Sequence, residues 1–210
     1  MNDFERKWHV EAKQKRGADA IRTISEAATL LAKDGRPELL TTRNLSEISG
    51  YSTGTIYRYF RRFEDIFVNL FLQRRTQAID KIVLLLEEHP PAQEARFLVA
   101  SIIERSIIEL ARPHPKVLQW VLRQFFKHAR EPEKLNVVMD RLILPWMVAV
   151  ERDQTASFRQ LSEVELRLVL RGIQAMIRSP FFEQDPIQGT PEHIQFVKQE
   201  AVRLLTNLST

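Results

Sequence analysis

Apolar residues recur three and four positions apart along almost the whole of this 210-residue chain. That spacing places apolar side chains on one face of a helix, and no segment shows the alternation that a half-buried strand requires. Prolines interrupt the pattern and are expected at the joints between helices, where a missing N–H costs little. The sequence therefore predicts an all-α fold, with helices near residues 21–31, 43–49, 53–60, 65–88, 92–111, 116–129, 133–152, 162–178 and 191–208.

Glycine and charge are distributed unevenly along the chain. Four of the six glycines lie in the first 54 residues, where tight turns are needed. Residues 1–63 hold 12 Lys and Arg against 8 Asp and Glu, whereas residues 64–210 hold 19 of each. The positive excess is where a polyanion would bind. We therefore predict a nucleic-acid-binding domain over 1–63 and a helical bundle over 64–210, joined by a helix that begins near Glu64.

Several function classes find no support in the sequence. The chain has no Cys, which excludes disulfides, thiolate metal ligands and cysteine nucleophiles. The first 17 residues lack the apolar core of a signal peptide, and the longest uncharged apolar run, 142–150, is far shorter than the roughly 20 residues that span a bilayer. The five His are scattered, without a zinc, phosphate-loop or nucleophile motif. We expect a cytoplasmic protein with no cofactor, metal, catalytic site or membrane partner, while an enzyme in the helical domain remains an alternative.

The segment from Thr41 to Phe60 has the pattern of a helix-turn-helix. Thr41 or Thr42 can cap a first short helix, Gly50 can reverse the chain, and Ser52 can cap a second helix. Residues 56 and 60 give that second helix one apolar face. Its outer face is small, polar and aromatic, which suits the major groove of double-stranded DNA, although a helical hairpin that binds nothing has the same outline. The outer residues are Thr53, Gly54, Thr55, Tyr57, Arg58 and Tyr59.

This stretch resembles the tetracycline-repressor (TetR) family of bacterial transcription regulators. The resemblance runs from Ile21 to about Ile66 and is carried by Ala27-Ala28, Gly35, Thr41-Thr42-Arg43, Gly50, Ser52, Thr55-Ile56-Tyr57-Arg58-Tyr59-Phe60 and Glu64-Asp65-Ile66. It implies that the second short helix is the recognition helix. Carried over by position, Arg43 would reach a base or phosphate, residues 53–55 would face bases, and Tyr57 and Tyr59 would bind phosphates.

The chain departs from the family pattern at two positions. Phe63 stands where the family usually has a phosphate-binding Lys, so Arg61 or Arg62 is expected to take that role. Tyr51 replaces a smaller turn residue, which alters the packing between the two helices.

For the C-terminal domain the resemblance implies a bundle with a ligand cavity and a two-helix face for a homodimer. Helix 162–178 is apolar on more than one side, so it is buried on more than one side. We assign the dimer face to this helix and to the last one, 191–208; the alternative is burial within one subunit. The assigned residues are Leu166, Leu170, Ile173, Ile177, Val197, Leu204 and Leu205.

Large apolar residues in the middle of the bundle indicate a cavity for a small apolar or aromatic molecule. The predicted lining is Phe97, Trp120, Phe125, Met139 and Trp146, with Arg123 placed to orient a polar group. These aromatic residues are also what a filled core would need, so both interpretations stay open. The predicted function is a repressor that this small-molecule inducer releases from a palindromic operator; a DNA-binding protein without a ligand is the alternative.

Overall fold

The structure, a computed structural model, describes residues 3–33, 35–111, 113–128, 139–183 and 185–207, without the side chains of 3–16 and 125–128. These residues form helices, with one isolated antiparallel bridge between Phe158 and Thr206. The predicted all-α class is confirmed. The helices are α1 (Asp3–Lys33), α2 (Thr42–Ser49), α3 (Thr53–Tyr59), α4 (Phe63–Glu87), α5 (Ala95–Ala111), α6 (Pro115–His128), α8 (Ile143–Arg152), α9 (Glu163–Glu183) and α10 (Pro191–Leu205), with a 3-10 turn, η1, at Pro37–Leu39.

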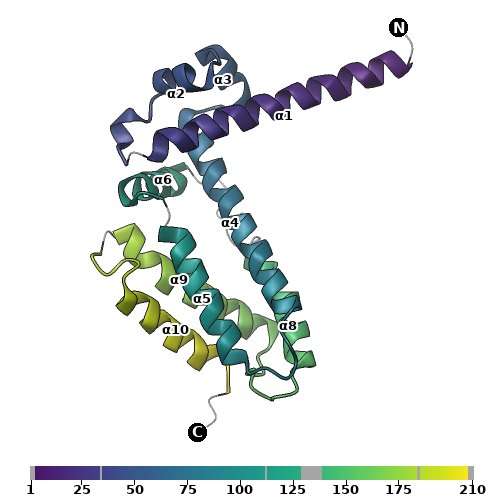
Figure 1. Cartoon of the computed structure of the whole chain (residues 1–210), viewed down its shortest axis with the longest axis vertical. Coiled ribbons are helices and arrows are strands. Elements are labelled where there is room, and N and C mark those ends of the chain that lie inside the picture. Colours follow the sequence, from purple (N-terminus) through teal and green to yellow (C-terminus); the bar gives the residue numbers. More distant parts are fainter. Residues whose placement is uncertain (1–2, 34, 112, 129–138, 184, 208–210) are drawn as a thin grey trace.

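Helices α1, α2 and α3 gather at one end of the molecule, and α4 runs from there along the bundle of α5, α8, α9 and α10 (Figure 1). Helix α4 contributes to two separate apolar cores. Ile66 and Phe67 are buried with α1–α3, whereas Ile79 and Leu86 are buried in the bundle. Helix α6 lies between the two parts, and its Val117 and Val121 belong to the core of the N-terminal part. The two parts therefore share α4 and α6 rather than meeting at a flexible linker.

The predicted helix over 133–152 is interrupted in its described part. A turn at residues 141–142 precedes α8, which begins only at Ile143. Pro145 has no N–H to donate to the carbonyl of residue 141, and its ring crowds that carbonyl, which favours an interruption of the helix there. Residues 133–138 of the prediction lie outside the described part of the chain.

Helix α9 passes through Pro180, although a break was expected there. Pro180 cannot donate to the carbonyl four residues earlier, that of Met176. The buried imidazole of His193 takes its place, because His193 Nε2 donates to Met176 O at 3.1 Å. The other ring nitrogen, Nδ1, accepts from the N–H of Gly189 at 3.1 Å. A residue from α10 thus satisfies the carbonyl that the proline leaves open, and the helix runs on to Glu183.

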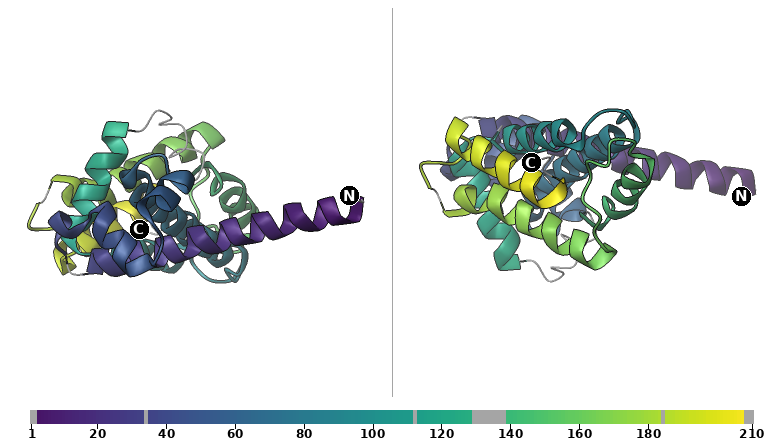
Figure 2. Two further views of the ribbon diagram at one scale, coloured as in Figure 1. Left: turned by 90° about the horizontal axis from the view of Figure 1, so that it is seen from above. Right: turned by 90° about the horizontal axis from the view of Figure 1, so that it is seen from below.

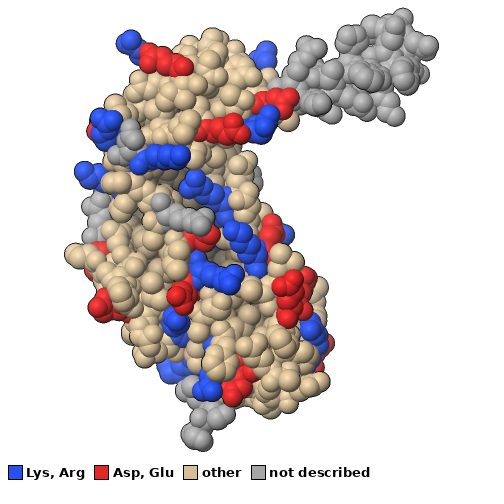
Figure 3. All heavy atoms as spheres, viewed as in Figure 1, with Lys and Arg blue, Asp and Glu red and all other residues tan. Residues whose placement is uncertain are grey.

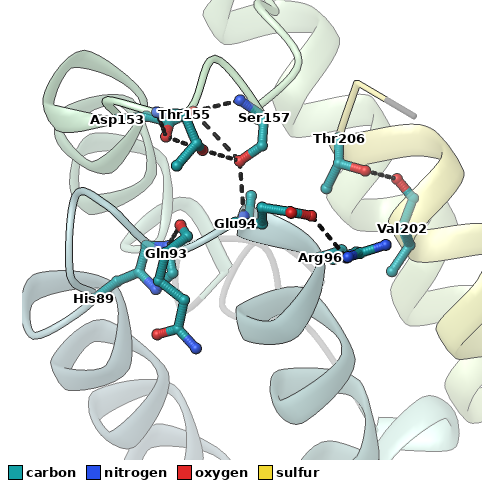
Figure 4. Close-up of polar contacts among 10 residues, drawn as sticks. His89, Gln93, Glu94, Arg96, Asp153, Thr155, Ser157, Val202 and Thr206 are labelled. Carbon is teal, nitrogen blue, oxygen red and sulfur yellow. Dashed lines mark hydrogen bonds and ion pairs between the residues drawn. The ribbon is translucent and has the colours of Figure 1, made fainter. Parts of the chain in front are cut away.

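The loop after α8 is hydrogen-bonded to the start of α5 (Figure 4). One oxygen of the Asp153 carboxylate accepts from the N–H of Thr155 at 2.9 Å, and the other accepts from the N–H of Ser157 at 2.7 Å and of Phe158 at 3.0 Å. The hydroxyl of Ser157 in turn accepts from the N–H of Ala95, the first residue of α5, at 2.8 Å. One carboxylate therefore organises the loop that follows α8 and holds it against the start of α5.

We expect Asp153→Ala to destabilise the protein by about 1–3 kcal/mol, because three backbone N–H groups lose their acceptor. Burial raises the pKa of Asp153, but hydrogen bonds from Thr155, Phe158 and Ser157 outweigh it and hold the pKa below its usual value. A carboxyl whose pKa is lowered by folding stabilises the fold at neutral pH and loses that effect as the pH falls through its folded-state pKa. Asp153→Asn should therefore reduce the change in unfolding free energy between neutral and acidic pH.

Urea unfolding at neutral pH and near roughly pH 3 measures both effects of Asp153. The control is Glu151→Ala, which removes an exposed carboxylate two residues earlier on α8. Equal unfolding free energies for the Asp153 and Glu151 variants would contradict the role given to Asp153.

Candidate nucleic-acid interface and ligand cavity

Helices α2 and α3 form a helix-turn-helix whose caps are the predicted residues. Thr41, rather than Thr42, caps α2, and its hydroxyl accepts from the N–H of Asn44 at 3.2 Å. Ser52 caps α3 in the same way, accepting from the N–H of Thr55 at 3.2 Å. Gly50, which ends α2, has a φ of 72°, a conformation that costs glycine little and other residues more. The tight turn between the helices follows from these capping and glycine residues.

Inward-facing apolar residues hold the two short helices in place. Leu45 of α2 and Ile56 of α3 are fully buried, and Phe60 follows α3 into the same core. Tyr51 is partly buried against this core, so the larger turn residue is accommodated by packing. On the outside, the hydroxyls of Tyr57 and Thr42 share a 3.0 Å hydrogen bond that joins α3 to α2.

The outer face of α3 presents the residues that the sequence assigned to DNA. Thr53, Gly54, Tyr57 and Arg58 are exposed, and Thr55 and Tyr59 are partly exposed. Arg58 donates to the hydroxyl of Tyr59 at 2.8 Å and lies over its ring. Arg43 on α2 is exposed and forms an ion pair with Glu47 at 3.1 Å. An exposed pair of this kind is weak, so Arg43 can exchange Glu47 for another anion at little cost.

The two arginines expected to replace the missing Lys differ in their surroundings. Arg62 donates its backbone N–H to the carboxylate of Asp65 at 3.1 Å, and its guanidinium lies 2.9 Å from the same group. Arg62 thus caps the start of α4, whereas Arg61 is exposed. Phe63 packs edge-on to Phe67, with ring centroids 5.2 Å apart, and near Trp120 at 6.5 Å. An aromatic contact between α4 and α6 stands where the family has a lysine.

A cavity of about 610 Å³ lies in the middle of the molecule, within the range of small-molecule sites. Two of the predicted lining residues, Met139 and Trp146, do line it. Three do not. Phe97 is 54% exposed on the outside of α5, Trp120 packs on Phe67 of α4 with ring centroids 5.3 Å apart, and Arg123 is exposed. The side chain of Phe125 lies outside the described part of the chain.

The cavity wall was missed because it comes from residues that resemble ordinary helix faces. Apolar groups come from α4, α5 and α9, and they include Ile79, Ile102, Ile103, Leu170, Ile173 and Ile177. Basic groups lie beside them, among them Arg75 on α4 and Arg178 on α9. Trp146 from α8 is buried and its indole N–H has no hydrogen-bond acceptor among the described residues.

One edge of the cavity reaches the N-terminal part of the chain. Thr29, Ala32 and Lys33, at the end of α1, belong to its lining, as does His114 between α5 and α6. Gly35, just beyond α1, has a φ of 66° and lies directly against the His114 ring, since an added Cβ would be 2.2–2.4 Å from three ring atoms. A molecule in the cavity would therefore touch elements of both parts.

The assignment of the dimer face needs correction. Leu166, Leu170, Ile173, Val197 and Leu205 are buried in the core of the single chain, and Ile177 and Leu204 pack against that core. Two of the apolar residues that α9 leaves exposed lie on the opposite face of the helix: Val164 is 64% exposed and Leu168 is 62% exposed. A helix that is apolar on two sides has one side for its own core and one left over, and sequence spacing alone did not tell them apart.

The described ranges offer neither a metal-binding cluster nor a membrane-spanning helix. No group of three or more His, Asp or Glu side chains is placed there to hold a metal ion. Nor is any helix in those ranges both long enough and apolar enough to cross a membrane.

Comparison with known proteins extends these observations. No family model matches the chain. Over 129 residues it is 30% identical to the fatty acid metabolism regulator protein of Bacillus subtilis (strain 168). The match covers 60% of this chain and 63% of that protein, so the chain spans less than two thirds of its relative.

Solved structures match over nearly the full length. A putative TetR-family transcriptional regulator from Mesorhizobium loti MAFF303099 aligns with a TM-score of 0.63 at 14% identity, covering 90% of this chain and 94% of that one. A TetR transcriptional regulator from Rhodococcus sp. RHA1 aligns with a TM-score of 0.57 at 20% identity, covering 93% and 100%. The chain therefore has the fold of TetR-family regulators, which confirms the fold expected from the sequence resemblance.

Proposed function

We propose that this chain is a transcriptional regulator that binds operator DNA through α3 as a homodimer and leaves it when a small molecule fills the cavity. The exposed outer face of α3, fixed by the Thr41 and Ser52 caps, carries the DNA-binding part of the proposal. The Bacillus subtilis relative supports a regulatory role by its name. We extend only that role, and not its metabolic pathway, to this chain.

The proposed contacts divide by chemistry. Thr53, Gly54 and Thr55 begin α3, where a recognition helix meets base edges. The hydroxyls of Tyr57 and Tyr59 and the guanidiniums of Arg58 and Arg61 are suited to phosphates. Arg43 serves either role, and Arg62 is proposed to act mainly by capping α4, given its contacts with Asp65.

A second copy of the chain is proposed to cover the outer face of α9. Val164, Leu168, Gly172 and Ala175 recur there at three- and four-residue spacing and all are exposed. Gly172 has open space around it, so another helix can come close. Phe196 on α10 is also exposed, and Figure 2 shows α9 and α10 side by side on the outside of the bundle. Two such copies would present two recognition helices to a palindromic site.

Occupation of the cavity is proposed to change the spacing of these recognition helices. Its lining includes α4, which begins just after α3, and the end of α1. A ligand that favours one arrangement of these helices changes DNA affinity only by its differential affinity for the two arrangements, typically about 5- to 150-fold. The same factor must appear in the ligand affinity when DNA is added.

Selection from a random double-stranded DNA library tests the DNA-binding proposal and does not require the operator sequence. The purified full chain should enrich an inverted repeat whose half-sites lie roughly 34–36 Å apart or a multiple of that distance. Recovery of unrelated sequences, with an affinity that depends on salt alone, would refute it.

For the selected site we expect Tyr57→Phe to weaken binding by about 0.5–1.5 kcal/mol, because one hydroxyl donor is lost. The loss should be similar for specific and unrelated DNA, since a phosphate contact carries no base information. Tyr51→Phe removes the same atom from the turn and is the matched control. Fluorescence anisotropy at one fixed salt concentration measures the DNA affinity of both variants. If Tyr57→Phe binds as tightly as Tyr51→Phe, the phosphate role is wrong.

A further inference from the structure

The described residues that line the cavity include five cationic side chains and one acid, Glu109. The cations are Lys33, Arg74, Arg75, Lys81 and Arg178. Lys81 lies 3.7 Å from Glu109, which leaves the lining strongly positive. Figure 3 shows Lys and Arg gathered over the middle of the molecule, along α4 and around a hollow. This charge distribution indicates a more polar ligand than the small apolar or aromatic molecule that the sequence suggested.

Two of these cations, Arg75 on α4 and Arg178 on α9, line the same cavity. Burial first, and then the charge of Arg178, lower the pKa of Arg75 to about 10. An arginine side chain is still protonated at neutral pH under these conditions, so two positive charges approach each other at the wall between α4 and α9. An anion placed there would relieve the repulsion and regain part of the lost solvation.

The rest of the wall is apolar. Ile79, Ile102, Ile103, Leu170 and Ile173 offer surface that an aliphatic or aromatic body would bury. Trp146, in the same lining, has an indole N–H without an acceptor among the described residues, a buried group that a ligand oxygen could satisfy. The cavity thus combines a cationic wall with an apolar interior.

We propose that the ligand is an anionic amphiphile, with an apolar body in the cavity and an acidic head group held between Arg75 and Arg178. A guanidinium binds carboxylate or phosphate oxygens through two parallel hydrogen bonds, which fixes the head group in position. Because Arg75 belongs to α4 and Arg178 to α9, the head group joins the helix that begins next to α3 to the helix proposed for the dimer. The inference rests on the proposed ligand-responsive regulator and gives its ligand a chemical class.

Calorimetric titration of the full chain without DNA tests the head group directly. The probes are decanoate, decyl phosphate, decanol and decylamine, each below its micellar concentration or, for decanol, its solubility limit. They share one apolar body and differ in charge. We expect saturable binding of decanoate or decyl phosphate. Decanol and decylamine should bind with an affinity lower by about tenfold or more. Whichever of the two acids binds more tightly identifies the head group. Decanol binding as tightly as both acids would overturn the proposal, and so would binding of neither acid.

Substitutions assign the head group to the two arginines. Arg75→Gln and Arg178→Gln should each weaken binding of the preferred acid by about tenfold or more and leave decanol unchanged. Arg105→Gln, an exposed arginine on α5 outside the cavity lining, is the matched control. If either Gln variant unfolds, Arg75→Lys and Arg178→Lys keep the charge while losing the paired hydrogen bonds, and should still weaken acid binding.

Acid affinity unchanged in all four cavity variants would overturn the assignment. Failure of the regulator proposal has a different signature, because the DNA selection above contains no ligand. An inverted repeat without acid binding refutes the ligand class alone, whereas acid binding without an inverted repeat refutes the regulator alone.

Discussion

A chain that carries both V164E and L168E is expected to be a folded monomer whose operator affinity is lower by roughly a hundredfold or more. Both side chains are exposed on α9, so the new carboxylates are solvated in the single chain and cost the fold little. In a dimer they would be buried against the partner's apolar face, which is costly for unpaired charge. Loss of the dimer removes the linked binding of the second half-site, and this produces the large drop in affinity.

Light scattering gives the mass of this variant, and urea unfolding gives its stability. The informative control is L170E, two residues further along the same helix. Leu170 is 7% exposed and belongs to the bundle core, so a buried carboxylate there should destabilise the chain itself by roughly 4 kcal/mol or more. A stable V164E/L168E dimer, or a folded L170E monomer, would show that the face has been assigned to the wrong side of α9.

The helix-turn-helix was predictable almost residue by residue because its determinants are local. A hydroxyl cap at Ser52, a left-handed Gly50 and two buried residues one helical turn apart, Ile56 and Phe60, depend only on near neighbours in the chain. Such short-range requirements appear in the sequence as residue types at fixed spacing. The all-helical class follows from periodicity for the same reason.

Features that depend on distant residues were not predictable in this way. Pro180 lies inside α9 because His193, from another helix, satisfies the carbonyl of Met176, and nothing within α9 signals that partner. Trp120 was predicted to line the cavity, yet it packs from α6 onto the start of α4, where Phe63 stands in place of the expected lysine. The basic side chains of the cavity, such as Arg75, looked like solvated positions on amphipathic helices.

The last prediction concerns the contact of Gly35 with His114, where the two parts of the chain meet. Gly35→Ala should cost more stability than Gly50→Ala. Both glycines have a similar left-handed φ, 66° and 72°, so each alanine pays the same backbone cost of about 1–2 kcal/mol. A Cβ at residue 50 meets nothing within 4 Å, whereas one at residue 35 falls 2.2–2.4 Å from the His114 ring. The extra cost therefore measures how firmly that ring is held against α1.

Combining Gly35→Ala with His114→Ala separates the two contributions. The second substitution removes the ring, so the double variant should recover the steric part of the loss and keep only the backbone part, close to that of Gly50→Ala. Urea unfolding of the unsubstituted chain, Gly35→Ala, His114→Ala and the double variant gives the coupling free energy between residues 35 and 114. A positive coupling shows that the His114 ring is held firmly against the end of α1, which would make this contact one route from the cavity edge to α3. Equal losses for Gly35→Ala and Gly50→Ala would mean that the ring moves aside freely and that the change must reach α3 through α4 instead.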